Sequence, residues 1–139
     1  MKKDKVFLDT DVILDLLTER EPHFEPAVKL FLKIQDKTIS AYTSPVAIAN
    51  IFYILNRHFD RKKAIQSLIK IKSLVKVINC GDRIIELALS SEFSDFEDSI
   101  QYYTALENGL DILITRNVKD YKTANIIVST PLEYITANE

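Results

Sequence analysis

Two hydrophobic patterns alternate along the chain. Short segments that are apolar on both faces and rich in β-branched and aromatic residues are KVFLD, TISAYTS, LVKVINC, DILITR and NIIVST. Strands of a parallel sheet that is covered on both faces have this composition. Longer stretches with helical spacing lie between and beside them, at 11–17, 25–34, 45–57, 61–72, 82–91 and 97–108. Strand and helix by turns predict an α/β fold with right-handed crossovers.

Length and composition fit one domain over residues 1–139. The chain has 139 residues, of which 47% are hydrophobic and 27% are charged, enough to bury one core. No repeat or low-complexity linker divides it. The two glycines leave no room for Gly-rich phosphate-binding loops, which excludes nucleotide cofactors of those classes. A net charge of -2 gives no overall attraction to nucleic acid or membrane, so a polyanion would need a local basic patch.

The sequence also predicts a compartment. One cysteine, Cys80, excludes an intramolecular disulfide framework. The apolar part of MKKDKVFLDT is too short for a signal peptide, and no apolar run reaches membrane-spanning length. We therefore expect a cytoplasmic protein without membrane contact.

Polar side chains stand at the ends of two predicted strands. Asp9 closes the first strand, while Thr115 and Asn117 close the DILITRN strand and Asp120 follows in the next turn. Asp98 stands at the start of a predicted helix. Ligands bind outside the carboxyl ends of strands in open α/β sheets, so these groups are expected at one rim. Clustered carboxylates need a cation, and hard oxygen ligands favour Mg²⁺ or Mn²⁺.

The acids near Asp9 have structural alternatives. Asp11 is either the N-cap of the helix that begins VILDLL, or an acid that orients a metal ligand without binding the metal itself, or both. Asp15 lies one helical turn further on and is expected to face solvent. Asp9 itself would be costly to bury without a cation or several hydrogen-bond donors.

The acids near Asp98 have structural alternatives too. Ser94 and Glu97 have the S-x-x-E form of a capping box, which puts Asp98 in the first helical turn. Glu97 is then the capping-box acid and Asp95 a first-turn acid. Asp98 on this interpretation only complements the helix dipole, an effect of about 0.3–1 kcal/mol.

Three segments together resemble a PIN domain, the nuclease fold of VapC-type toxins: VFLDTDVILDLL, SPVAIANIFYILNR and DFEDSIQYYTALENGLDILITRNVKDY. The resemblance runs from about Lys5 to about Tyr134. It implies a single-domain, three-layer α/β sandwich with a central, mostly parallel sheet, and a Mg²⁺- or Mn²⁺-dependent endoribonuclease. It also implies three partners: an RNA substrate, a cognate antitoxin that holds the toxin inactive, and a second copy in a homodimer.

The resemblance assigns site residues one by one. The first acid of the family corresponds to Asp9, and the acid before its I-x-x-x-A-like helix corresponds to Asp98. The T-x-D/N motif corresponds to Thr115 and Asn117, with Asp120 in the following D-F/Y position. The resemblance thus implies a metal site at Asp9, Asp98 and Asn117, with Thr115 holding a carboxylate or a metal-bound water.

Asn50 departs from the family pattern. It stands where the family carries an acid in the helix after the second strand, and an amide can coordinate a metal but adds no charge. We count Asn50 among the catalytic residues, with an asparagine bonded to neighbouring backbone as the structural alternative. The firm carboxylates are then Asp9 and Asp98, with further acids at Asp11, Asp95, Glu97 or Asp120.

Two other functions stay open. VFLDTDVIL matches the D-x-D-x-T/V opening of haloacid-dehalogenase-type phosphatases, in which Asp9 would be the nucleophile and Asp11 the general acid. Asn50 also keeps open a non-catalytic PIN-like module that binds RNA or protein.

Two surface features bear on RNA. The basic residues between Arg57 and Lys76 either steer RNA or form a solvated helix face. Tyr102, Tyr103 and Tyr121 either stack on bases or pack in the core.

Overall fold

The fold is known from a computed structural model that describes residues 3–121 and 125–138. The strands are β1 (Lys5–Leu8), β2 (Ser40–Thr43), β3 (Val75–Val77), β4 (Ile112–Ile114) and β5 (Ile127–Ser129). The α-helices are α1 (Thr10–Leu17), α2 (Phe24–Gln35), α3 (Pro45–His58), α4 (Arg61–Lys72), α5 (Asp82–Leu89), α6 (Phe96–Glu107) and α7 (Pro131–Ala137). A single 3-10 turn, η1 (Val118–Tyr121), is also present in the described ranges.

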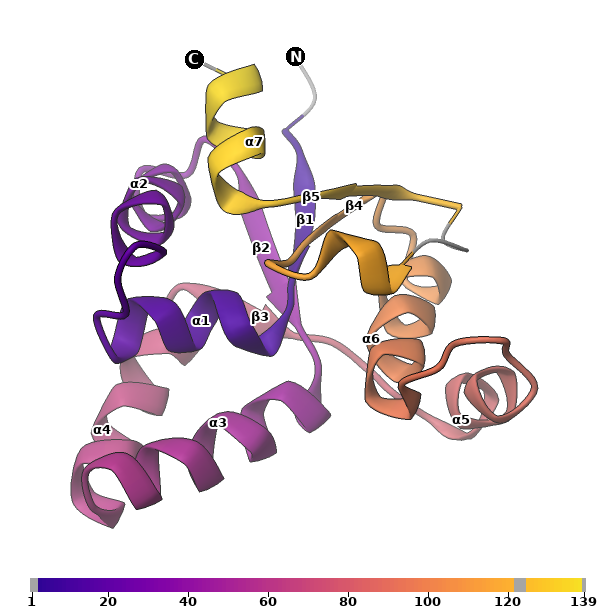
Figure 1. Cartoon of the computed structure of the whole chain (residues 1–139), viewed down its shortest axis with the longest axis horizontal. Helices are drawn as coiled ribbons and strands as arrows, with labels where there is room; N and C mark the ends of the chain where they lie inside the picture. The colour runs from indigo at the N-terminus through magenta and orange to yellow at the C-terminus, as the bar shows by residue number, and fades with distance from the viewer. Residues whose placement is uncertain (1–2, 122–124, 139) are drawn as a thin grey trace.

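The five strands form one sheet in the order β3-β2-β1-β4-β5, and each neighbouring pair is parallel. Helices α1, α2, α3, α4 and α7 lie on one side of this sheet and α5 and α6 on the other (Figure 1). The predicted three-layer α/β architecture is therefore confirmed.

Side-chain alternation along β1 explains the two cores. Val6 and Leu8 are buried in the larger hydrophobic cluster, which α1–α4 and α7 cover. Phe7 points to the opposite face and packs in a second cluster with Tyr102 and Leu113. Because successive strand residues face opposite sides, a strand covered on both faces must be apolar throughout, as KVFL is.

The helix C-terminal to β5 was not predicted. Thr130 is the N-cap of α7, its side chain accepts a hydrogen bond from the Glu133 backbone, and Glu133 bonds back to the Thr130 N–H. Pro131 occupies the first turn, where a missing N–H costs nothing. The sequence TPLE carried this capping-box signal in full.

Strand register brings the polar strand ends together. Leu8 pairs with Ile114, and the Asp9 N–H donates to the Ile114 carbonyl at 3.0 Å. Asp9 and Thr115 are thus the first residues beyond two adjacent strands at the same edge. Gly109 adopts a φ of 74° after α6, which ends that helix before β4 as predicted.

No helix in the described part of the chain is both long and apolar enough to cross a membrane.

Candidate functional site

Asp9 is buried and held by several donors. It is 6% exposed and forms the N-cap of α1, with Oδ1 accepting the Thr10 N–H at 2.8 Å. Its Oδ2 accepts from the Thr115 hydroxyl at 2.9 Å and from the Tyr121 hydroxyl at 3.0 Å. Burial raises the pKa of Asp9, and these hydrogen bonds oppose that rise. The N-cap of this helix is Asp9, so the alternative in which Asp11 caps it is wrong.

Asp11 lies in the first turn of α1 and faces the loop after β4. Its Oδ2 accepts from the Arg116 backbone N–H at 3.2 Å, from Asn117 Nδ2 at 3.1 Å and from the Thr115 hydroxyl at 3.4 Å. Its Oδ1 is buried without a hydrogen-bond partner. Burial and the charge of Asp9 raise the pKa of Asp11 to about 7. Asp11 therefore fixes the Thr115–Asn117 loop beside Asp9.

Asp98 lies in the first turn of α6, as predicted, but the predicted capping box is wrong. The N-cap is Asp95 rather than Ser94, and Asp95 Oδ1 accepts the Asp98 N–H at 3.0 Å. The Asp98 carboxylate is half-buried. Burial raises its pKa to about 7, helped by the negative charges of Asp9, Asp95 and Asp120. Burial and the neighbouring negative charges therefore both disfavour the ionised form of this carboxylate.

Tyr121 connects the two acids, a role that the sequence did not reveal. Its hydroxyl lies 3.0 Å from Asp9 Oδ2 and 3.4 Å from Asp98 Oδ1. The ring is 3% exposed and packs edge-on against Phe93, so it lies in the core rather than on a base-stacking surface. A tyrosine in the D-F/Y position, where a phenylalanine fills the same space, was the available signal for a hydroxyl at the site.

Asn50 and Glu97 form a contact between α3 and α6. Asn50 Nδ2 donates to Glu97 Oε1 at 2.6 Å, so its amide bonds to a side chain across the site rather than to neighbouring backbone. Glu97 is not a capping-box acid. Burial raises the pKa of Glu97, the hydrogen bond from Asn50 opposes that rise, and the charge of Asp9 adds a smaller rise. Glu97 therefore supplies an acid beside Asn50, the amide that stands where the family pattern has an acid.

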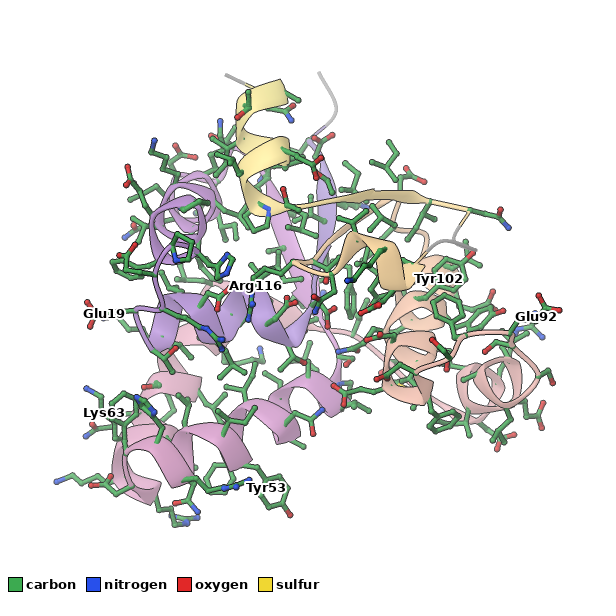
Figure 2. All side chains as sticks on the ribbon, in the orientation of Figure 1. Glu19, Tyr53, Lys63, Glu92, Tyr102 and Arg116 are labelled. Carbon is green, nitrogen blue, oxygen red and sulfur yellow. The ribbon has the colours of Figure 1, made fainter. Side chains whose placement is uncertain are left out.

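Asp15 is buried, so the prediction that it faces solvent is wrong. Its side chain is 2% exposed, and Oδ2 lies 2.7 Å from Arg116 Nε in an ion pair that lacks the alignment of a hydrogen bond. Figure 2 shows Arg116 beside α1. The pair adds a further contact between the loop after β4 and α1, beside the bond from the Arg116 N–H to Asp11.

Two of these carboxylates suit a divalent metal ion. Among residues 3–121 and 125–138, no three His, Cys, Asp or Glu side chains group closely enough to hold an ion by themselves. Asp9 and Asp98 nevertheless supply two hard oxygen ligands that share one hydroxyl donor. Mg²⁺ commonly binds through one or two carboxylates and keeps several waters. The pair fits such an ion, whose remaining positions water would fill.

The predicted basic track lies away from these acids. Its residues fall on the C-terminal end of α3, on α4 and on β3. Figure 1 shows α4 on the far side of the molecule from α6. RNA steering by these residues stays a prediction.

Comparisons with known proteins agree with this geometry. A family model for the PIN domain matches residues 5–119. The chain is 27% identical to Ribonuclease VapC1 of Aquifex aeolicus (strain VF5) over 139 residues, 96% of this chain and 95% of that protein. The chain belongs to the PIN domain family. This membership replaces the phosphatase alternative.

Solved structures share the fold. A toxin-antitoxin complex from Klebsiella pneumoniae matches with a TM-score of 0.68 and 23% identity, covering 91% of this chain and 97% of that one. VapC20 of Mycobacterium tuberculosis, described as a Sarcin-Ricin loop cleaving toxin, matches with a TM-score of 0.63 and 17% identity. That match covers 78% of this chain and 86% of VapC20.

Proposed function

We propose that the chain is a metal-dependent endoribonuclease of the VapC type that acts in the cytoplasm as the toxin of a toxin-antitoxin pair. The observation that carries this is the meeting of Asp9 and Asp98 around one hydroxyl, at the carboxyl edge of a PIN-type sheet. The similarity to Ribonuclease VapC1 along nearly the whole chain supports the reaction. Mg²⁺ or Mn²⁺ is the cofactor we propose.

Each residue has a distinct role in this proposal. A bound divalent ion lowers the pKa of a water and neutralises charge on the leaving oxygen of a phosphodiester. Asp9, fixed by donors from α1 and the loop after β4, is the rigid ligand, and half-buried Asp98 is the second. Thr115 holds Asp9 in orientation through its 2.9 Å hydrogen bond. Asn117, which donates to Asp11 through Nδ2, keeps its amide oxygen available as a third ligand.

The proposed partners are RNA, a cognate antitoxin and a second copy of the chain. The Klebsiella pneumoniae neighbour is a toxin-antitoxin complex, which supports the antitoxin. Exposed apolar side chains on α3 and α4, among them Tyr53 at 66% and Ile69 at 66%, offer surface for a protein partner.

Incubation of the purified chain with a pool of structured and single-stranded RNAs tests the function. Cleavage is expected with Mn²⁺ or Mg²⁺ and should stop when EDTA is added. Asp98→Asn purified in parallel controls for contaminating nuclease. Binding of RNA without cutting would favour the non-catalytic module instead.

The raised acid pKa values predict a pH effect on the metal-free protein. Asp11 and Asp98 have pKa values of about 7, above the ordinary 3.8, so the folded chain takes up protons that the unfolded chain does not bind until lower pH. The free energy of unfolding should therefore increase as the pH falls from 8 to 5.5. This added stability is lost when the pH rises through about 7. Mn²⁺ needs the ionised carboxylates, so its stabilising effect should be larger at pH 8. Thermal melts with and without Mn²⁺ measure both effects. A metal-free Tm that is lower at pH 5.5 than at pH 8 would contradict the raised pKa values of Asp11 and Asp98.

Asn50→Asp should exchange stability for metal affinity. The change replaces a hydrogen bond with two facing carboxylates, because Asn50 Nδ2 and Glu97 Oε1 are 2.6 Å apart. The metal-free Tm should fall by a few degrees and the Mn²⁺ affinity should rise. Asn56→Asp makes the same change at an exposed position near the end of the same helix and should alter neither. Calorimetric titration with Mn²⁺ provides the comparison, and equal affinities in wild type and Asn50→Asp would place Asn50 outside the metal's reach.

A further inference from the structure

The Tyr121 hydroxyl has one proton and two carboxylate neighbours. It lies 3.0 Å from Asp9 Oδ2 and 3.4 Å from Asp98 Oδ1, the two acids proposed to bind the metal. Packing against Phe93, with ring centroids 5.8 Å apart, holds the ring in the core. The hydroxyl therefore lies beside the carboxylate oxygens whose lone pairs an ion shared by both acids would use.

The hydrogen bonds of Asp9 leave little room for an ion. Oδ2 already accepts from both Thr115 and Tyr121, which occupies the two lone pairs of that oxygen. Oδ1 accepts the Thr10 N–H at 2.8 Å. Coordination through Oδ2 therefore requires that one of the two hydroxyl donors turn away.

The two donors differ in where they can turn. Thr115 Oγ1 has a second carboxylate acceptor, Asp11 Oδ2 at 3.4 Å, which is not one of the proposed ligands. The second acceptor of Tyr121 is Asp98 Oδ1, which is itself a proposed ligand. When an ion binds through Asp9 Oδ2, Thr115 still has an acceptor on Asp11, whereas the other acceptor of Tyr121 is a carboxylate that would bind the same ion.

We propose that the Tyr121 hydroxyl competes with the divalent ion for Asp9 and Asp98 and so lowers the metal affinity of the site. It lies between the two carboxylates in the metal-free protein and must turn away from Asp9 Oδ2 when an ion binds to that oxygen. This inference rests on the proposed metal site, and it makes Tyr121 a positioning residue that weakens binding of the ion.

Calorimetric titration of the full chain with Mn²⁺ tests the competition. Tyr121→Phe keeps the packing and removes the hydroxyl, so Mn²⁺ should bind about tenfold more tightly than to wild type, since a hydrogen bond to a charged group contributes that much or more. The metal-free Tm should fall in the same variant because Asp9 loses a donor. If Tyr121→Phe folds poorly, Tyr121→Leu provides a second variant. It also lacks the hydroxyl and should bind Mn²⁺ more tightly than wild type.

Tyr134→Phe is the matched control. Its hydroxyl also donates to an aspartate, Asp4 Oδ2 at 2.6 Å, but α7 carries it away from the site. Its Mn²⁺ affinity should equal that of wild type. Suppose that wild type binds Mn²⁺ and Asp98→Asn does not. If Tyr121→Phe then binds Mn²⁺ no more tightly than wild type, the competition is overturned and the proposed function still stands. Absence of Mn²⁺ binding from wild type and both Tyr121 variants overturns both.

Discussion

Asp98→Asn should lower the rate of RNA cleavage by more than about 100-fold, since even residues that only orient a metal ligand contribute about 10–100-fold. The substitution keeps the shape of the side chain and an oxygen 3.4 Å from the Tyr121 hydroxyl, but it removes the charge that a metal ion requires. Cleavage of an RNA substrate at a Mn²⁺ concentration that saturates wild type measures the effect.

The same variant should be at least as stable as wild type. Burial and repulsion by neighbouring acids raise the pKa of Asp98 to about 7, so keeping this carboxylate ionised at pH 8 costs folding free energy. A neutral amide relieves that repulsion, so the Tm at pH 8 should rise while activity disappears. Asp95→Asn is the control, because asparagine also serves as an N-cap and the change removes one nearby charge. Equal losses of activity in both variants would indicate a general charge effect rather than a metal ligand.

Arg116→Met should destabilise the fold by about 3 kcal/mol, because it leaves a buried carboxylate without its ion-pair partner. Asp15 is 2% exposed and lies 2.7 Å from Arg116 Nε. For a chain of this size the loss corresponds to a Tm roughly 10 °C lower. Thermal unfolding at pH 8 measures it, and the deficit should shrink as the pH falls, because burial raises the pKa of Asp15.

Two further variants separate the ion pair from packing. Arg116→Met combined with Asp15→Leu removes both charges and should recover most of the lost stability, because a buried pair and a well-packed apolar pair are often similar in energy. Lys29→Met breaks the exposed pair with Glu25, whose atoms are 3.6 Å apart, and should change the Tm little. A Tm for Arg116→Met close to that of wild type would show that Asp15 is solvated rather than paired.

Much of the fold followed from the sequence because strands covered on both faces leave a clear pattern. The apolar runs located all five strands found in residues 3–121 and 125–138, and the helix predicted at 61–72 is α4 without change of bounds. The rim that gathers Asp9, Asp98 and Thr115 was also predicted, since parallel strands end at one edge.

The misses share a physical cause, which is that a single sequence does not show which partner an acid finds. Asp15 was predicted to face solvent because its spacing from Asp11 gave no hint that Arg116, 101 positions later, would reach it. Asp95, rather than Ser94, caps α6 because both residue types suit an N-cap and only backbone geometry distinguishes them. The Tyr121 hydroxyl was missed because its ring alone accounts for the core position.

The central claim is that Asp9 and Asp98 form a divalent-metal site, and one titration tests it most directly. Mn²⁺ is titrated by calorimetry into wild type and into Asp98→Asn at pH 8, above the pKa of about 7 of Asp98. Binding to wild type that disappears in Asp98→Asn is the predicted result. Equal binding to the two proteins, or no binding to wild type, would contradict the claim.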